Sequence, residues 1–274
     1  MDQILVASDL SVRSDRAIAR AAALAREHQA KLTFIHVVDD AMPLDTAEMV
    51  RAAAVETLRG QLRVCCPEEE ADHAIEAVIG DPVKEVIALA STINAGLLVL
   101  GLHRERHYLD LIRQTTMERL IRASTTPVLL VSTAAGQPYQ HLLAAIDMSP
   151  PAARAISLGR DLTPNARTTM FHAYHVPYRR MANPSDAAAT TLPFLHEAED
   201  QYREWADTAQ LTDLPKPQFI DGSPHAALDQ IMASDPADLL ALGAHSRSNL
   251  GRYVLGGFTS GLIRNPPCDL LVCR

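Results

Sequence analysis

The sequence predicts an α/β protein built from two tandem doubly wound parallel-sheet domains. Blocks of sequence recur in the same order in each half of the chain, and within each half short apolar runs alternate with amphipathic segments. This alternation is typical of a parallel sheet with helices on both faces. The expected domains are residues 1–136 and 137–274, joined by the linker "STAAGQPYQH" at 132–141.

Five blocks of the first half have counterparts in the second half. "ILVASDLS" at 4–11 matches "LLAAIDMS" at 142–149, and "LLVLGLH" at 97–103 matches "LLALGAH" at 239–245. The other three matches align His36-Val37 with His175-Val176, Gly80-Asp81-Pro82 with Gly222-Ser223-Pro224, and "TTPVLLV" at 125–131 with "NPPCDLLVCR" at 265–274. Shared order over five blocks indicates a repeated unit.

Each block also predicts an element of structure. "ILVAS" has the continuous apolar character of a strand buried on both faces. The next segment carries Ile18, Ala21, Ala22 and Ala25 at helical spacing, with Ser14 as the expected N-cap. Pro82 and Pro224 are expected in the first turns of helices. Residues 39–62 and 178–212 are expected to form helices with loops.

The last apolar segment of each half, 127–131 and 269–273, is a candidate edge strand. An exposed apolar edge invites strand pairing. We expect these two segments to pair with each other inside the chain, so that one chain imitates a dimer of two domains.

Composition excludes several classes of protein. The net charge of −8 argues against a general nucleic-acid binder. No apolar run approaches the roughly 18 residues of a membrane span, and the N-terminus has no leader pattern, so we expect a cytoplasmic protein without a membrane partner. The four cysteines have neither disulfide nor zinc spacing, and no metal site is expected.

Ligands of doubly wound sheets bind beyond the carboxyl ends of the strands. Asp9 and Asp147 follow the first strand of each half, where a carboxylate can accept a hydrogen bond from a ribose hydroxyl. The loops after the fourth strands, 101–115 and 243–259, can offer backbone N–H groups and a helix N-terminus to phosphate oxygens.

These residues, taken in order, resemble the universal stress protein family, and the repeat resembles a tandem member. The resemblance implies an adenine nucleotide α-hydrolase-like fold, and a regulatory role in the stress response. ATP-binding members carry G-x2-G-x9-G-[ST] in the fourth-strand loop. The first half keeps Gly101 and Thr115 but has Arg104 and Gln114 at the other two glycine positions. The second half keeps Gly243 and Gly256, with Ser246 and Gly257 at the remaining two positions.

The second half is therefore the better candidate for ATP or another adenine nucleotide. Its candidate residues are Asp147, His175, Val176, Gly222, Gly243, His245, Ser246, Arg247, Gly256, Gly257, Phe258 and Thr259. The weaker candidates of the first half are Asp9, Val37, Gly80, Gly101 and Thr115.

Several structural explanations compete with this hypothesis. Asp9 and Asp147 can cap the following helix, the histidines can be packed or hydrogen-bonded, and the prolines can simply begin helices. No nucleophile–base motif or P-loop occurs, so we expect a binding module, with an unidentified protein partner, rather than an enzyme. A nucleotide hydrolase or transferase on the same fold (slow ATP hydrolysis included) and a ligand-free scaffold remain the alternatives.

Overall fold

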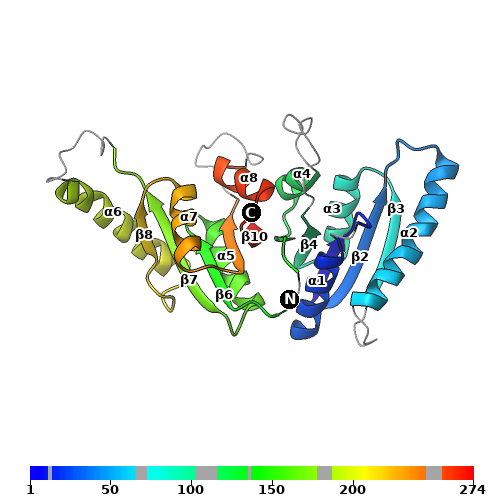
Figure 1. The fold of residues 1–274 in the computed structure, drawn as a ribbon, viewed down its shortest axis with the longest axis horizontal. Helices are drawn as coiled ribbons and strands as arrows, with labels where there is room; N and C mark the ends of the chain where they lie inside the picture. Colours follow the sequence, from blue (N-terminus) through cyan, green and yellow to red (C-terminus); the bar gives the residue numbers. More distant parts are fainter. Residues whose placement is uncertain (12–13, 66–72, 103–115, 135–136, 178–186, 245–254) are drawn as a thin grey trace. The chain divides into compact units, whose positions relative to one another are not determined.

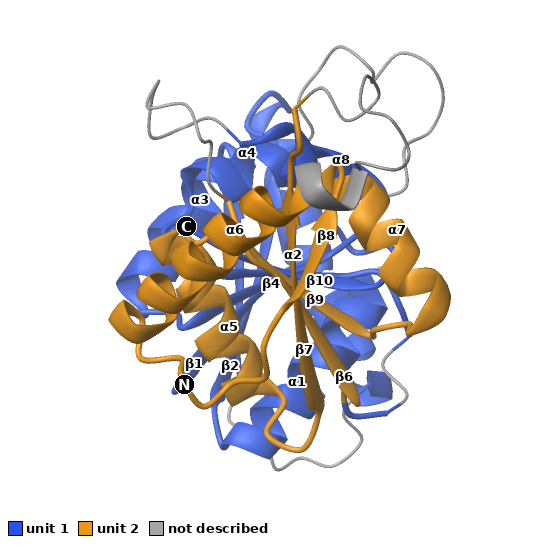
Figure 2. Cartoon of the chain, turned by 90° about the vertical axis from the view of Figure 1, so that its left-hand side faces the viewer, with its two compact units in different colours: residues 1–138, 246–274 blue, residues 139–245 orange. Residues whose placement is uncertain are grey.

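A computed structural model describes residues 1–11, 14–65, 73–102, 116–134, 137–177, 187–244 and 255–274 (Figure 1). The chain forms two compact units, coloured separately in Figure 2. The first unit comprises residues 1–138 and 246–274, and the second comprises residues 139–245. The second repeat is thus divided, because its last segment packs within the first unit.

The sheet of the first unit has the strand order β3-β2-β1-β4-β5-β10. Neighbouring strands among the first five pair in parallel. The strands are β1 (Gln3–Ala7), β2 (Lys31–Val38), β3 (His73–Ile79), β4 (Leu97–Gly101), β5 (Val128–Val131) and β10 (Asp269–Cys273). The doubly wound parallel architecture predicted from the alternation is confirmed for these five strands.

Five helices of the described residues belong to this unit: α1 packs with α2, α3 packs with α4, and α4 also contacts α8. They are α1 (Ser14–His28), α2 (Leu44–Cys65), α3 (Pro82–Thr92), α4 (Thr116–Ala123) and α8 (Gly257–Arg264). The predicted apolar stripe of α1, Ile18, Ala21, Ala22 and Ala25, is buried. Burial of this stripe against β1 and β4 holds the helix on the sheet.

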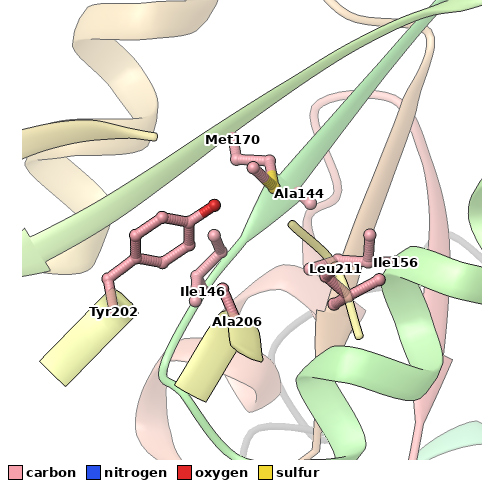
Figure 3. Packing of buried hydrophobic residues seen from close by; sticks show 7 residues of the cluster. All are labelled: Ala144, Ile146, Ile156, Met170, Tyr202, Ala206 and Leu211. Carbon is pink, nitrogen blue, oxygen red and sulfur yellow. The ribbon is translucent and has the colours of Figure 1, made fainter. Parts of the chain in front are cut away.

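The second unit repeats the same plan with the strand order β9-β6-β7-β8, all parallel. Its strands are β6 (His141–Ala145), β7 (Arg167–Tyr174), β8 (Gln218–Asp221) and β9 (Leu239–Gly243). Its helices are α5 (Pro150–Leu162), α6 (Ala187–Thr208) and α7 (Pro224–Ser234). Figure 3 shows the core cluster in which strand and helix side chains meet, formed by Ala144, Ile146, Ile156, Met170, Tyr202, Ala206 and Leu211.

The two segments expected to pair at the ends of the repeats do lie side by side. β5 and β10 are antiparallel, with Leu130 opposite Leu270 and Val128 opposite Val272. All residues of both strands are buried. The last strand of the second repeat therefore completes the sheet of the first unit.

Candidate functional site

A cavity of about 390 Å³ lies in the first unit, where the predicted ligand edge of the sheet is. It is lined by the ends of β1, β2 and β4 and by the first turns of α3 and α4. Asp9, Val37 and Gly101, three of the residues predicted for the first half, are in its wall. Its volume is in the range of small-molecule sites. Most of the remaining wall is aliphatic, including Ile35, Val86, Leu100, Met117 and Leu120.

The carboxylate of Asp9 is held by the loop that follows β1. Its Oδ1 accepts hydrogen bonds from the Ser11 N–H at 3.0 Å and from the Ser14 hydroxyl at 2.6 Å. Leu10, between Asp9 and Ser11, has a φ of 62°, in the left-handed region that an aliphatic residue rarely adopts. The first turn of α1 and this strained loop together orient the carboxylate at the cavity wall.

Asp147 is held in the same way in the second unit. Its Oδ1 accepts from the N–H of Ser149 at 3.1 Å and from the Ser149 hydroxyl at 2.5 Å, and Met148 has a φ of 60°. Ser149, not Asp147, is the N-cap of α5, because its hydroxyl accepts from the Ala152 N–H. The interpretation of Asp147 as a helix cap is therefore wrong; the carboxylate instead holds the capping side chain.

The histidine pairing expected from the repeat is also wrong by three residues. His36 Nδ1 lies 2.9 Å from the Ser8 carbonyl oxygen, and His172 Nδ1 lies 2.8 Å from that of Ile146. Because a carbonyl only accepts, both Nδ1 atoms carry the hydrogen. Strand register pairs Ala7 with Ile35 and Ala145 with Phe171, so His172 is the counterpart of His36. His175 is exposed beyond the end of β7.

The neighbouring candidate Val176 is buried, at 3% exposure. Its side chain therefore belongs to the packed interior of the second unit. With His172 matched to His36, Ala173 becomes the counterpart of Val37, which lines the cavity of the first unit. The sequence-based alignment missed this because a histidine–valine pair occurs in both halves at different registers.

The glycines after β3 and β8 are equivalent, as predicted. The Gly80 N–H donates to Val38 and the Gly222 N–H donates to Tyr174, each at 3.0 Å. Gly222 has a φ of 149°, which a side chain would strain.

Each of these glycines is followed by a capped helix that begins at the predicted proline. Asp81 caps α3 before Pro82, and Ser223 caps α7 before Pro224. The Lys84 N–H, 2.9 Å from the Asp81 carboxylate, lowers the pKa of that group; desolvation opposes this, and Arg119 lowers it further.

The candidate glycines around the fourth-strand loop of the second half have different surroundings. A Cβ at Gly243 would lie 2.6 Å from the Ala152 backbone nitrogen, so this glycine allows α5 to approach the end of β9. Gly256 is the N-cap of α8, with an ordinary φ of −62° and no side-chain capping bond. A Cβ at Gly257 would meet nothing within 4 Å. Thr259 is buried at 3% exposure.

These candidates divide between the two compact units. Gly243 belongs to the second unit, whereas Gly256, Gly257, Phe258 and Thr259 belong to the first. His245, Ser246 and Arg247, like Thr115 of the first half, lie outside the described residues. The described part of α8 offers the N–H groups of its first turn, which suit an anion.

Two contacts beside the aspartates were not predicted from the sequence. Ser14 joins the Asp9 network from α1, although helical spacing indicated only a cap. The single tryptophan of the chain, Trp205, directs its indole Nε1 to the Ser149 carbonyl oxygen at 3.3 Å. No motif marks either contact, because each depends on how a helix packs beside a strand end.

Two kinds of feature are absent from the residues that the structure describes. No helix in those ranges has both the length and the apolar character that crossing a membrane requires. Nor do three or more His, Cys, Asp or Glu side chains gather there in an arrangement able to hold a metal ion.

Comparison with known proteins identifies the family. The model of the universal stress protein family matches the chain twice, over residues 1–132 and 138–274. Stress response protein NhaX of Bacillus subtilis is 27% identical over 161 residues, which cover 47% of this chain and 97% of that protein. Universal stress protein A homolog 1 of Coxiella burnetii is 29% identical over 139 residues, covering 47% of this chain and 94% of its own.

A solved structure matches the whole chain in fold. The universal stress protein from Archaeoglobus fulgidus superimposes with a TM-score of 0.73 at 16% identity, covering 99% of this chain and 98% of the other. Two matches of the family model, arranged one after the other, account for both halves of the repeat. The chain therefore belongs to the universal stress protein family and is a tandem member of it.

Proposed function

We propose that this protein is a regulatory module of the stress response that binds ATP or another adenine nucleotide in its second half. One observation carries the proposal. The second unit repeats, at equivalent positions, the framework that borders a cavity of about 390 Å³ in the first unit. That framework consists of an aspartate in a strained loop, a histidine hydrogen-bonded to the carbonyl of the residue directly after the first strand, and a glycine at the end of the fourth strand.

Each part of the framework has a proposed role. Asp147, already oriented by Ser149, accepts a hydrogen bond from a ribose hydroxyl. His172 and Ala173 take the strand-two positions first given to His175 and Val176. Outside this framework, the proposed phosphate-binding groups are the backbone of Gly256 and the first turn of α8, because N–H groups at a helix N-terminus favour anions.

The remaining candidates extend this proposal around the same ligand. Gly222, Gly243, Phe258 and Thr259, together with His245, Ser246, Arg247 and Gly257, complete the proposed second-half site. In the first half we propose a weaker site at Asp9, Val37, Gly80, Gly101 and Thr115. Arg104 and Gln114 replace two glycines of its phosphate loop, which supports the lower rank of this half.

The proposed domains remain residues 1–136 and 137–274, paired through β5 and β10. The proposed location is the cytoplasm, with an unidentified protein as a partner. Binding, rather than catalysis, is the proposed activity.

Isothermal titration with ATP tests the proposal. We expect one equivalent to bind to the wild-type chain, and Gly256→Arg to weaken binding at least about tenfold, or 1.4 kcal/mol. Because Gly256 has a φ of −62°, arginine can adopt its backbone conformation, and the variant should fold. Asp147→Asn should weaken binding, while the matched Asp9→Asn should bind as the wild type does.

Other outcomes would favour the competing functions. The absence of heat with wild-type protein would favour a ligand-free scaffold. Release of phosphate from bound ATP above the buffer rate would favour a hydrolase. Equal loss of binding in Asp147→Asn and Asp9→Asn would contradict the assignment of the nucleotide to the second half.

A further inference from the structure

The first residue of β10, Asp269, carries a buried carboxylate with an unusual number of partners. Its side chain is 0% exposed. Its Oδ1 accepts from the N–H groups of Ser132 and Thr133 at 2.9 and 3.0 Å. The same oxygen accepts from the hydroxyls of Ser132 and Thr133 at 3.2 and 2.9 Å. Both donor residues follow β5 directly, so the carboxylate fixes the end of one strand to the start of the other.

A buried arginine completes this network. Arg20 of α1, with a side chain 7% exposed, places its Nε 3.6 Å from Asp269 Oδ2. Its NH1 donates to the Gln137 carbonyl oxygen at 2.8 Å, and Arg16 donates to that of Ser132 at 3.0 Å. A buried carboxylate is costly without such a counter-charge and donors. All of these residues lie in the first unit, and they join α1 and β10 to Ser132, Thr133 and Gln137.

The two charged residues of this network are not repeated at the equivalent positions of the other half. Aligning residues 128–131 with 270–273 places Pro127 where Asp269 stands. The block that aligns residues 4–11 with 142–149 places Leu158 where Arg20 stands. A second copy of β5, docked in place of β10, would therefore bring a proline instead of a carboxylate. The half-buried Ser132 and the exposed Thr133 would then lose the acceptor of their N–H and hydroxyl groups. The buried charge of Arg20 would lose its counter-charge, which is the costlier loss because a buried charge needs a partner.

We propose that Asp269 determines pairing specificity at this interface: β5 accepts the β10 of its own chain and rejects the β5 of a second copy. Specificity of this kind needs a penalty for the wrong partner as well as a gain for the right one. The covalent connection adds to the preference, because it raises the effective concentration of β10 beside β5. The proposal does not depend on nucleotide binding.

The test uses two full-length copies of the chain that carry different tags and are expressed together. For the wild type we expect monomers by light scattering and little co-purification of the second tag. For Asp269→Ala we expect co-purification to rise at least about tenfold, because both pairings then lack the carboxylate and the right one loses its advantage over the wrong one. Amide hydrogen exchange in β10 should accelerate by at least about tenfold as well.

A matched control separates this effect from a general loosening of the linker. Asp238 holds the other side of the linker, accepting from the N–H groups of Gln140 and His141 at 2.8 and 2.9 Å. Asp238→Ala should leave both co-purification and the exchange of β10 unchanged. If Asp269→Ala does not accumulate, Thr133→Val removes one of the hydroxyl donors, and the same two readouts apply. The proposal would be overturned if the network variant that is measured matched the wild type in both co-purification and β10 exchange. It would also be overturned if Asp238→Ala changed these two readouts as much as the network variant does.

Discussion

Substitution of Gly243 tests whether the close packing of α5 against the end of β9 requires a residue without a side chain. A Cβ built at this position lies 2.6 Å from the Ala152 backbone nitrogen and 2.9 Å from the Pro151 carbonyl carbon. Both atoms belong to the first turn of α5, so neither can move without shifting the helix. We expect Gly243→Ala to lower the free energy of unfolding by about 1–3 kcal/mol, the usual cost of overpacking.

Urea unfolding followed by tryptophan fluorescence measures this change. Trp205 is the only tryptophan, and it packs against the core cluster of the same unit as Gly243. Gly159→Ala is the control. A Cβ there would lie 3.1 Å from the two methyl groups at the tip of Leu142 and at an ordinary contact distance of 3.6 Å from the Ala241 Cβ. No backbone atom is among these neighbours, and alanine favours the helix, so stability should change by less than about 1 kcal/mol. A Gly243→Ala protein within about 0.5 kcal/mol of wild type would refute the packing argument.

Three further perturbations test separate contacts. Ser223→Ala removes the cap of α7 and should cost about 1 kcal/mol in urea unfolding; no change would mean that the cap is dispensable. Arg264→Met removes the Nε donor that lies 2.8 Å from Glu118 Oε1, and the Glu118 side chain is only 1% exposed. The free energy of unfolding in urea should therefore fall by about 1–3 kcal/mol, whereas a fall of only a few tenths would mean that the pair behaves as an exposed one. The Lys84 N–H lowers the pKa of Asp81, so the stabilisation is complete above the unfolded-state value near 3.8 and declines below it. Thermal melts should therefore show Asp81→Ala less stable than wild type at neutral pH, with a difference that narrows in acid; a constant difference would contradict the charged cap.

The elements predicted most accurately are those that local chemistry determines. Pro82 and Pro224 begin α3 and α7, because a ring without an N–H suits the first turn. The continuous apolar runs became the central strands β1 and β4, because a strand buried on both faces cannot carry alternating polar residues.

Register was the part that sequence could not determine. His36 and His175 share a following valine, and this local likeness favoured their alignment. The true counterpart, His172, is identified by the hydrogen bond from its Nδ1 to the carbonyl oxygen of Ile146, the residue directly after β6. This contact joins residues that are far apart in the sequence. A one-dimensional pattern contains no information on which carbonyl a ring nitrogen will meet.

The cavity of the first unit was predicted only in part. The carboxyl edge of the sheet was identified because parallel strands end together there, and three of the residues named from it, Asp9, Val37 and Gly101, lie in the cavity wall. The walls formed by Val86, Met117 and Leu120 were not, because their helix positions look like ordinary core. Cavity shape depends on the packing of three or more elements, which no motif records.

The division of the second repeat also has a consequence for synthesis on the ribosome. Residues 139–245, the whole second unit, are translated before residues 246–274, which the first unit needs. The nascent first repeat therefore exposes the apolar edge of β5 until β10 emerges, although it is made first. The sheet of the first unit can therefore be completed only after the second unit has been synthesised, although synthesis of the first unit begins earlier.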